Sequence, residues 1–142
     1  MSRVLILLFL ATHFTFASIH PIDGKRSGPI DSACLAQARE LATIIDALPH
    51  PAHWDYYVLC NQNLWADALR RADNHDTDWA FTSLKDHKTF MNGTMFQRRS
   101  EMPDGITPEF IIAHELGHIE TGSGSEDTAN CWARQHPVRS RK

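Results

Sequence analysis

Two histidines and a glutamate in the segment HELGH, residues 114–118, are the side chains of this sequence best suited to catalysis. His114 and His118 lie four residues apart, so on a helix their imidazoles project from one face, one turn apart. Two ring nitrogens on one face can bind a single zinc ion at about 2.0–2.1 Å. Glu115 lies about 100° further round the helix, where its carboxylate can accept a proton from water at the metal. The spacing therefore predicts a catalytic zinc site with Glu115 as the general base.

A catalytic zinc ion needs a third protein ligand and one open position. Glu126 is the best candidate, because the glycine-rich stretch GSGS, residues 122–125, lets the chain reverse after the histidine helix. Asp127 and His136 are the alternatives. Asn130 lies one turn beyond Glu126 and could hydrogen-bond a ligand imidazole, which would fix the tautomer of that ring. The competing interpretations are a solvated, histidine-rich helix for the motif and an ordinary surface amide for Asn130.

The histidine motif lies in a segment that has the features of a well-capped amphipathic helix. Thr107 suits the N-cap, Pro108 suits the first helical position, and Gly122 suits the end. Apolar side chains that would bury this helix lie opposite the histidines, namely Ile112, Leu116 and Ile119. Ser125 then caps a further helix, and the small residue Gly117 permits the two helices to approach closely. A buried helix that presents His, Glu and His inward must satisfy them, and a metal ion does so.

The earlier part of the chain is assigned from periodicity and composition. The expected elements are a helix over 31–48, strands over 54–60 and 88–96, a short helix or a loop over 61–72, and an irregular polar segment over 73–88. The second strand is expected to run into a turn at Asn92-Gly93. The order of these elements predicts a small α+β domain with an N-terminal helix, a short sheet, the histidine helix and a following ligand helix.

The first residues have the features of a secretory signal peptide. Arg3 precedes an apolar run that extends from Val4 to Ala17 and ends in small residues. This run of about fourteen residues is shorter than the roughly twenty needed to cross a bilayer, so export is favoured over a membrane anchor. The expected organisation is a signal peptide over 1–17, an irregular arm over 18–30, one domain over 31–137 and a flexible basic tail over 138–142. Lys25-Arg26 is a dibasic candidate for a processing site.

The sequence contains three cysteines, Cys34, Cys60 and Cys131, a number that suits one disulfide and one free thiol in an oxidising compartment, either extracellular or periplasmic. On the helix over 31–48, Cys34 lies about 21 Å from the C-terminal end. On a strand that returns beside that helix, Cys60 lies about 20 Å along. This geometry favours a Cys34–Cys60 bond, with Cys131 buried as a small apolar residue, although the sequence alone leaves the other pairings open.

The charge distribution excludes some classes of partner. The chain has 14 basic and 17 acidic residues and a formal net charge of −3. Its basic residues are scattered apart from short pairs and the C-terminal RSRK. No nucleic-acid partner and no stable membrane insertion are therefore expected, and the expected partner is a peptide or protein substrate. The oligomeric state is left open.

The segment HELGH, followed shortly by SEDTANCWA, resembles the gluzincin metallopeptidases over residues 105–135. It is most similar to the small single-domain forms, including minigluzincin and ImmA-type proteins, in which a His-Glu-x-x-His helix precedes a helix with Glu-x-x-Ala-Asn or Glu-x-x-Ala-Asp. The resemblance implies a zincin-like fold with Glu115 as general base. The implied zinc ligands are His114, His118 and Glu126. The resemblance also implies that KTFM, residues 88–91, is the edge strand along which a peptide substrate pairs.

Two departures from the family pattern bear on activity. Asn130 stands where larger gluzincins often carry aspartate, and little chain follows the last helix. Larger relatives stabilise the tetrahedral intermediate with a Tyr or His from a C-terminal lobe, so here the stabilising group must come from earlier in the chain. The candidates are His75, His87, Tyr56 and Tyr57. The leading expectation is thus a secreted zinc-dependent peptidase, and the alternative is a non-catalytic secreted domain stabilised by zinc. A third expectation is a precursor that residues 18–26 hold inactive, for instance with His20 at the metal.

Overall fold

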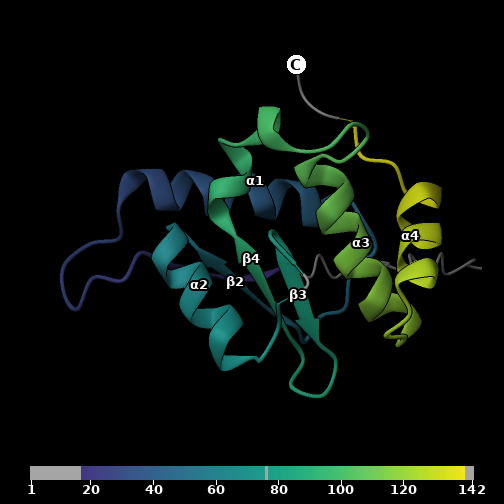
Figure 1. Ribbon diagram of the computed structural model, residues 1–142, viewed down its shortest axis with the longest axis horizontal. Coiled ribbons are helices and arrows are strands. Elements are labelled where there is room, and N and C mark those ends of the chain that lie inside the picture. The colour runs from purple at the N-terminus through teal and green to yellow at the C-terminus, as the bar shows by residue number, and fades with distance from the viewer. Residues whose placement is uncertain (1–16, 76, 140–142) are drawn as a thin grey trace, which may run out of the picture.

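A mixed sheet of four short strands lies at the centre of the molecule (Figure 1). The structure is a computed structural model that describes residues 17–75 and 77–139. In spatial order the strands are β1 (Ser18–Ile22), β2 (Asp55–Leu59), β4 (Lys88–Asn92) and β3 (Ala80–Ser83). The first three run parallel to one another, and β3 pairs antiparallel with β4. Except for Ala17, the expected signal peptide lies outside the described residues.

Side chains alternate between the two faces of this sheet, as the pleat requires. One face carries the main core, where Tyr56, Val58 and Met91 are fully buried beneath helices α1 and α3. The other face carries a row of stacked rings from the four strands, listed in order as His20, Tyr57, Phe90 and Phe81. Trp65 of helix α2 packs against Phe81 at the end of this row. The faces of these rings contact one another, so the row holds the sheet together.

Four helices pack around the sheet, and side-chain caps mark the start of three of them. They are α1 (Ser32–Asp46), α2 (Gln62–Arg71), α3 (Pro108–Thr121) and α4 (Glu126–Gln135). The side chains of Asn61, Thr107 and Ser125 each accept a hydrogen bond from a backbone N–H in the first turn of the helix that follows. Two short 3₁₀ turns, η1 (Gly93–Phe96) and η2 (Arg99–Glu101), connect β4 to α3. Together the elements form the small α+β fold that the sequence predicted.

Three expectations about the sheet were wrong. Residues 18–22 of the expected irregular arm form β1, which pairs along its whole length with β2. Residues 80–83 of the expected irregular segment form β3. The strand over 88–92 is an inner strand between β2 and β3, so the edge strand next to α3 is β3 and not KTFM. The chain leaves the extended conformation at Asn92-Gly93, where a turn was expected, and residues 93–96 form η1.

A disulfide joins Cys34 of α1 to Cys60 just after β2, with 5.3 Å between the two Cα atoms. This confirms the predicted pairing. The expectation that Cys131 is buried was wrong, because its thiol is exposed. Ala129 and Ala133 form the buried face of α4, and a residue two positions from each lies about 200° round the helix, on the solvent side. In the ranges that the structure describes, no helix combines the length and the apolar character needed to cross a bilayer.

Candidate metal centre

Helix α3 buries the histidine motif between the sheet and helix α4. Ile112 and Leu116 are fully buried against the core, which fixes the rotation of the helix and turns His114 and His118 toward α4. The helix ends at Gly122, whose φ of 62° is left-handed and therefore suits glycine. This turn directs Ser123 back toward the last turn of α3, where its N–H donates to the carbonyl of His118. The chain can then enter α4 beside the two histidines.

Each imidazole is held by an acceptor that fixes its tautomer. His118 Nδ1 lies 2.7 Å from the carbonyl oxygen of Ser123, and His114 Nδ1 lies 2.9 Å from Asn130 Oδ1. A carbonyl oxygen can only accept, so both Nδ1 atoms carry the hydrogen and donate it. Each Nε2 therefore presents a lone pair, and the two Nε2 atoms lie 3.1 Å apart. Asn130 thus has the position expected of a residue that orients a metal ligand.

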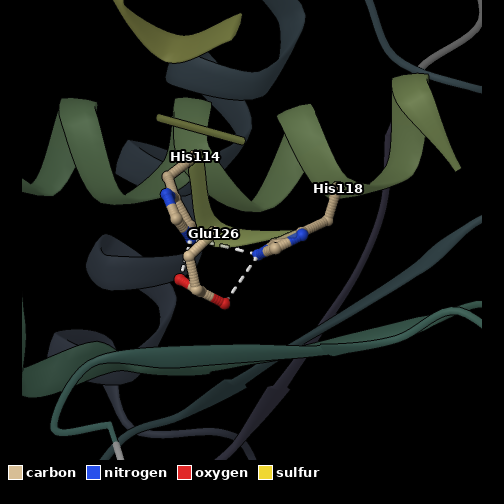
Figure 2. A group of neighbouring side chains, drawn as sticks. All are labelled: His114, His118 and Glu126. Carbon is tan, nitrogen blue, oxygen red and sulfur yellow. Dashed lines mark hydrogen bonds and ion pairs between the residues drawn. The ribbon is translucent and has the colours of Figure 1, made fainter. Parts of the chain in front are cut away.

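The carboxylate of Glu126 completes a triangle of acceptor atoms with the two imidazoles (Figure 2). One carboxylate oxygen lies 3.0 Å from His114 Nε2, and the other lies 3.4 Å from His118 Nε2. Two ligands held about 2.0–2.1 Å from one ion at tetrahedral angles lie about 3.3 Å apart, so all three spacings fit a shared cation. Two lone pairs and an anionic oxygen would otherwise face one another. The donor set of two imidazoles and one carboxylate leaves a fourth position open, as in catalytic zinc sites.

Close packing of α3 on α4 brings Glu126 to this position. A Cβ atom at Gly117 would lie 2.9 Å from the carbonyl oxygen of Ala129 and 3.0 Å from its Cα atom. Neither backbone atom can move aside without moving α4. Ala129 is fully buried at this contact. The small residues at the crossing therefore set the separation of the two helices, as the sequence predicted, and with it the reach of Glu126.

Glu115 lies beside the triangle and is itself buried, with 5% of its surface exposed. Burial raises the pKa of its carboxyl group above the usual value, and a hydrogen bond from Thr82 together with the nearby His114 and His118 opposes that shift. The Thr82 hydroxyl donates to Glu115 Oε2 over 2.6 Å. Burial thus favours the protonated form of Glu115. A carboxylate of this kind beside a candidate metal site is suited to accept a proton from water.

A cavity of about 570 Å³ opens over the histidines and Glu115. On one side lie the three acceptor residues and Asn130, and on the other lies the edge strand β3 with the residues around it. Much of its wall is apolar, with contributions from Trp79, Phe81, Leu84, Ile106 and Phe110. The cavity is thus open to a ligand along β3 and offers both a polar floor and apolar walls.

The four candidate stabilisers of a tetrahedral intermediate lie elsewhere, and none is among the described residues that line this cavity. His75 is exposed near Asp73, and His87 is exposed and stacks on Trp54. Tyr56 is fully buried in the core, and burial raises the pKa of its hydroxyl. Tyr57 stacks between His20 and Phe90 on the far face of the sheet. The structure does not bring these four side chains to the site.

The alternative metal ligands are also elsewhere. The cluster of ligating atoms in the described residues contains Glu126 and neither Asp127 nor His136. His136 stacks on Trp132, and its Nδ1 donates to the carbonyl oxygen of the same residue. His20 lies on β1, at the opposite edge of the sheet from β3, and bonds to Asp55 over 2.8 Å. His20 therefore does not occupy the metal site.

Thr82 is a site residue that sequence reasoning missed, because it lies in the segment that was expected to be irregular. A weak signal was present in WAFTS, residues 79–83, where Trp, Phe and Thr are residue types enriched in strands.

Comparisons with family models, with curated proteins and with solved structures gave no match to this chain. What the site can do therefore rests on the geometry described above.

Proposed function

We propose that this chain is a secreted zinc-dependent peptidase. The observation that carries the proposal is the convergence of three metal-ligating atoms from His114, His118 and Glu126, within 4.8 Å of one another. Zinc is the metal proposed because two imidazoles, one carboxylate and an open fourth position are typical of catalytic zinc sites. A buried carboxylate beside them, Glu115, adds the base that peptide hydrolysis needs.

Each site residue has a distinct task in the proposed reaction. Zinc, when bound by the three ligands, supplies a Lewis acid that polarises the scissile carbonyl and lowers the pKa of water. Glu115 accepts the proton of the attacking water and passes it to the leaving amine. Asn130 and the carbonyl of Ser123 hold the two imidazoles with Nε2 free. The base and the ligands are thus oriented before a substrate arrives. Groups that need not reorient during the reaction stabilise the transition state more effectively.

The position of β3 indicates how a peptide would bind. It is the last strand of the sheet, so its outer edge offers backbone groups that can pair with an extended chain. The same strand borders the cavity above the histidines. Trp79, Phe81 and Phe110 line that cavity and suit an apolar side chain next to the scissile bond. We therefore propose an extended peptide with an apolar residue at the cleavage site as the substrate.

The proposal of secretion has two supports. The Cys34–Cys60 disulfide is typical of proteins from an oxidising compartment. The sequence of residues 1–17 has the basic start, the apolar run and the small terminal residues of a signal peptide. Amino-terminal sequencing of exported material should begin at Ser18, and material that retains Met1 after export would contradict this part of the proposal.

The substitution Glu115→Gln tests the reaction directly. The variant should keep one zinc ion per chain, because Glu115 is not a ligand, and should lose peptide cleavage by about 100-fold or more, because its amide cannot accept the proton. Cleavage is measured by digestion of an unbiased peptide library with mass-spectrometric readout. Glu120→Gln is the matched control, since it makes the same change at an exposed position of the same helix. Undiminished cleavage by Glu115→Gln would refute the assignment of the base.

A second candidate function is a non-catalytic secreted domain that zinc stabilises. It is favoured by the positions of His75, His87, Tyr56 and Tyr57, none of which reaches the cavity to stabilise a tetrahedral intermediate. Under this alternative the protein binds zinc and a chelator lowers its melting temperature, but no library peptide is cleaved. Under the leading proposal the chelator also abolishes cleavage, and added zinc restores it.

A further inference from the structure

Behind Glu115 a chain of hydrogen bonds crosses the edge of the sheet. Thr82 of β3 lies directly opposite Thr89 of β4 in the antiparallel pair, and their hydroxyl oxygens are 2.9 Å apart. The indole N–H of Trp54 donates to the Thr89 hydroxyl oxygen over 2.9 Å. Thr82 in turn donates to Glu115 Oε2 over 2.6 Å. Four side chains from β3, β4, α3 and the segment before β2 are thus connected in one line.

The chemistry of the two ends fixes the direction of every bond in this line. An indole N–H can only donate, and an ionised carboxylate can only accept. The Thr82 hydrogen is used toward Glu115, so the bond between the two threonines must be donated by Thr89. Each hydroxyl therefore accepts one bond and donates one, and none of the three donors is free to turn elsewhere.

Burial makes this arrangement rigid. Thr89 is fully buried, and Trp54 and Glu115 are 7% and 5% exposed. Away from water, a hydrogen bond to a charged oxygen is stronger than at the surface, and a lost partner is not replaced by solvent. The Thr82 hydroxyl is therefore held in one position, and so is the carboxylate oxygen that it bonds.

We propose that Thr82 is the positioning residue of the general base, and that Thr89 and Trp54 orient its hydroxyl. By holding Oε2 of Glu115, Thr82 fixes the carboxylate and leaves the other oxygen for the proton of the attacking water. This inference rests on the proposed function for its catalytic meaning, while the coupling of Thr82 to Glu115 stands on the geometry alone. Thr82 also belongs to the strand proposed to bind the peptide, so one residue of β3 connects substrate pairing with the orientation of the base.

The first test compares Thr82→Val with Thr82→Ser. Valine keeps the β-branched shape without the donor, so kcat should fall by about 10–100-fold while KM and zinc content stay within about threefold of the wild type. Serine keeps the donor and should restore kcat to within about threefold of wild type. Thr43→Val, at an exposed position of α1, is the matched control and should not change kcat. Equal loss in the Val and Ser variants, or no loss in either, would overturn the proposal.

The second test needs no activity, and so separates this inference from the proposed function. In the metal-free protein, Thr82→Val should lower the equilibrium ratio of folded to unfolded protein by about tenfold or more, because Glu115 loses its donor. In a Glu115→Met background, where the acceptor is already absent, the same change should have little effect. If the two substitutions are strongly coupled but the protein cleaves no peptide, the proposed peptidase activity is refuted, and Thr82 remains the residue that positions Glu115. Additive effects in this cycle would overturn the positioning role, whatever the activity.

Discussion

At the scale of single residues, the two histidines proposed as metal ligands are oriented by groups outside the acceptor cluster. The Ser123 carbonyl and the Asn130 amide oxygen take the Nδ1 hydrogens, so both Nε2 lone pairs are directed at the same point. These Nε2 atoms lie 3.1 Å apart and close to a carboxylate. A cation relieves this repulsion, so metal binding should stabilise the fold as well as create the site.

A single ion pair at the start of α3 should govern part of the acid stability. Burial raises the pKa of Glu109, but the hydrogen bond from Arg99 over 2.9 Å, a backbone hydrogen bond, the charge of Arg99 and the Thr107 hydroxyl together outweigh it, and the pKa lies below the ordinary 4.5. A lowered pKa stabilises the fold above the unfolded-state value, and that contribution is lost as the pH falls through the folded-state value. Arg99→Gln should therefore cost about 1–2 kcal/mol at pH 7, and the difference from wild type should shrink below about pH 4.5.

Urea unfolding at a series of pH values measures this difference. Glu40→Gln is the control, because it removes the exposed partner of Arg99 and leaves the Arg99–Glu109 pair in place. The loss of unfolding free energy in Glu40→Gln should be smaller than the loss in Arg99→Gln at every pH. A difference for Arg99→Gln that stays constant from pH 7 to pH 3 would show that Glu109 does not titrate as described.

Residue spacing predicted a good part of the site. The four-residue interval of His114 and His118 sufficed for a shared helix face, and the glycine-rich turn before Glu126 indicated a third ligand that the structure brings beside them. Asn130 followed from helical spacing in the same way. Thr82 did not, because its role depends on a cross-strand pair and on the rotation of α3, and both are set by tertiary packing.

At the scale of elements, the crossing of α3 and α4 determines whether Glu126 reaches the two histidines. Gly117→Ala would stabilise an isolated helix by about 1 kcal/mol. In this protein the new Cβ would meet backbone atoms of Ala129 at 2.9 and 3.0 Å. We expect α4 to be pushed away, with a cost of about 1–3 kcal/mol in unfolding free energy and zinc affinity weakened about tenfold or more.

Thermal unfolding and zinc titration of the Gly117→Ala variant test this expectation. Gly124→Ala is the matched control, since no atom would lie within 4 Å of its Cβ and its φ is not left-handed. That variant should retain its stability to within about 0.5 kcal/mol. A Gly117→Ala protein as stable as wild type, with unchanged zinc affinity, would mean that the helix crossing is not tight.

The long helices and two of the four strands, β2 and β4, were predictable, and β1 and β3 were not. Helices α3 and α4 have side-chain caps, α1 has several turns of apolar periodicity, and the expected ranges of all three were close to those observed. Strand β1 contains a proline, Pro21, and strand β3 has only four residues, so neither has the composition that identified β2 and β4, which are no longer than β1. Missing β3 also led to KTFM being taken as the edge strand, because the position of a strand in a sheet depends on what pairs beside it.

At the scale of the whole molecule, the disulfide connects the helix that covers the core to the end of an inner strand. Cys34 and Cys60 are 26 residues apart in sequence, and closing a loop of that size lowers the entropy of the unfolded chain. The double substitution of Cys34 and Cys60 by Ser should therefore cost about 3–4 kcal/mol, measured by guanidinium unfolding without reductant. Cys131→Ser, at the exposed free thiol, should change stability by less than about 0.5 kcal/mol. Equal effects in the two proteins would contradict the stabilising role of the disulfide.

The architecture concentrates the chemistry at one side of the molecule. The sheet, α1 and the disulfide form the body of the molecule, and the aromatic row lies on the far face of the sheet. The proposed metal ligands, the proposed base and residues of β3 all line one cavity beside α3 and α4. A substrate that pairs with β3 would therefore meet the base and the open metal position together.

Zinc titration of the folded, metal-free protein, followed by calorimetry, tests the central claim most directly. The wild type should bind one equivalent with a dissociation constant below about 1 µM. Glu126→Gln should weaken binding by more than about 100-fold, since loss of an outer-shell partner alone costs 10–100-fold. Asp127→Asn, the same change one residue further along α4, should remain within about threefold of wild type. Failure of the wild type to bind zinc, or equal affinity in the Glu126→Gln variant, would contradict a metal centre built from His114, His118 and Glu126.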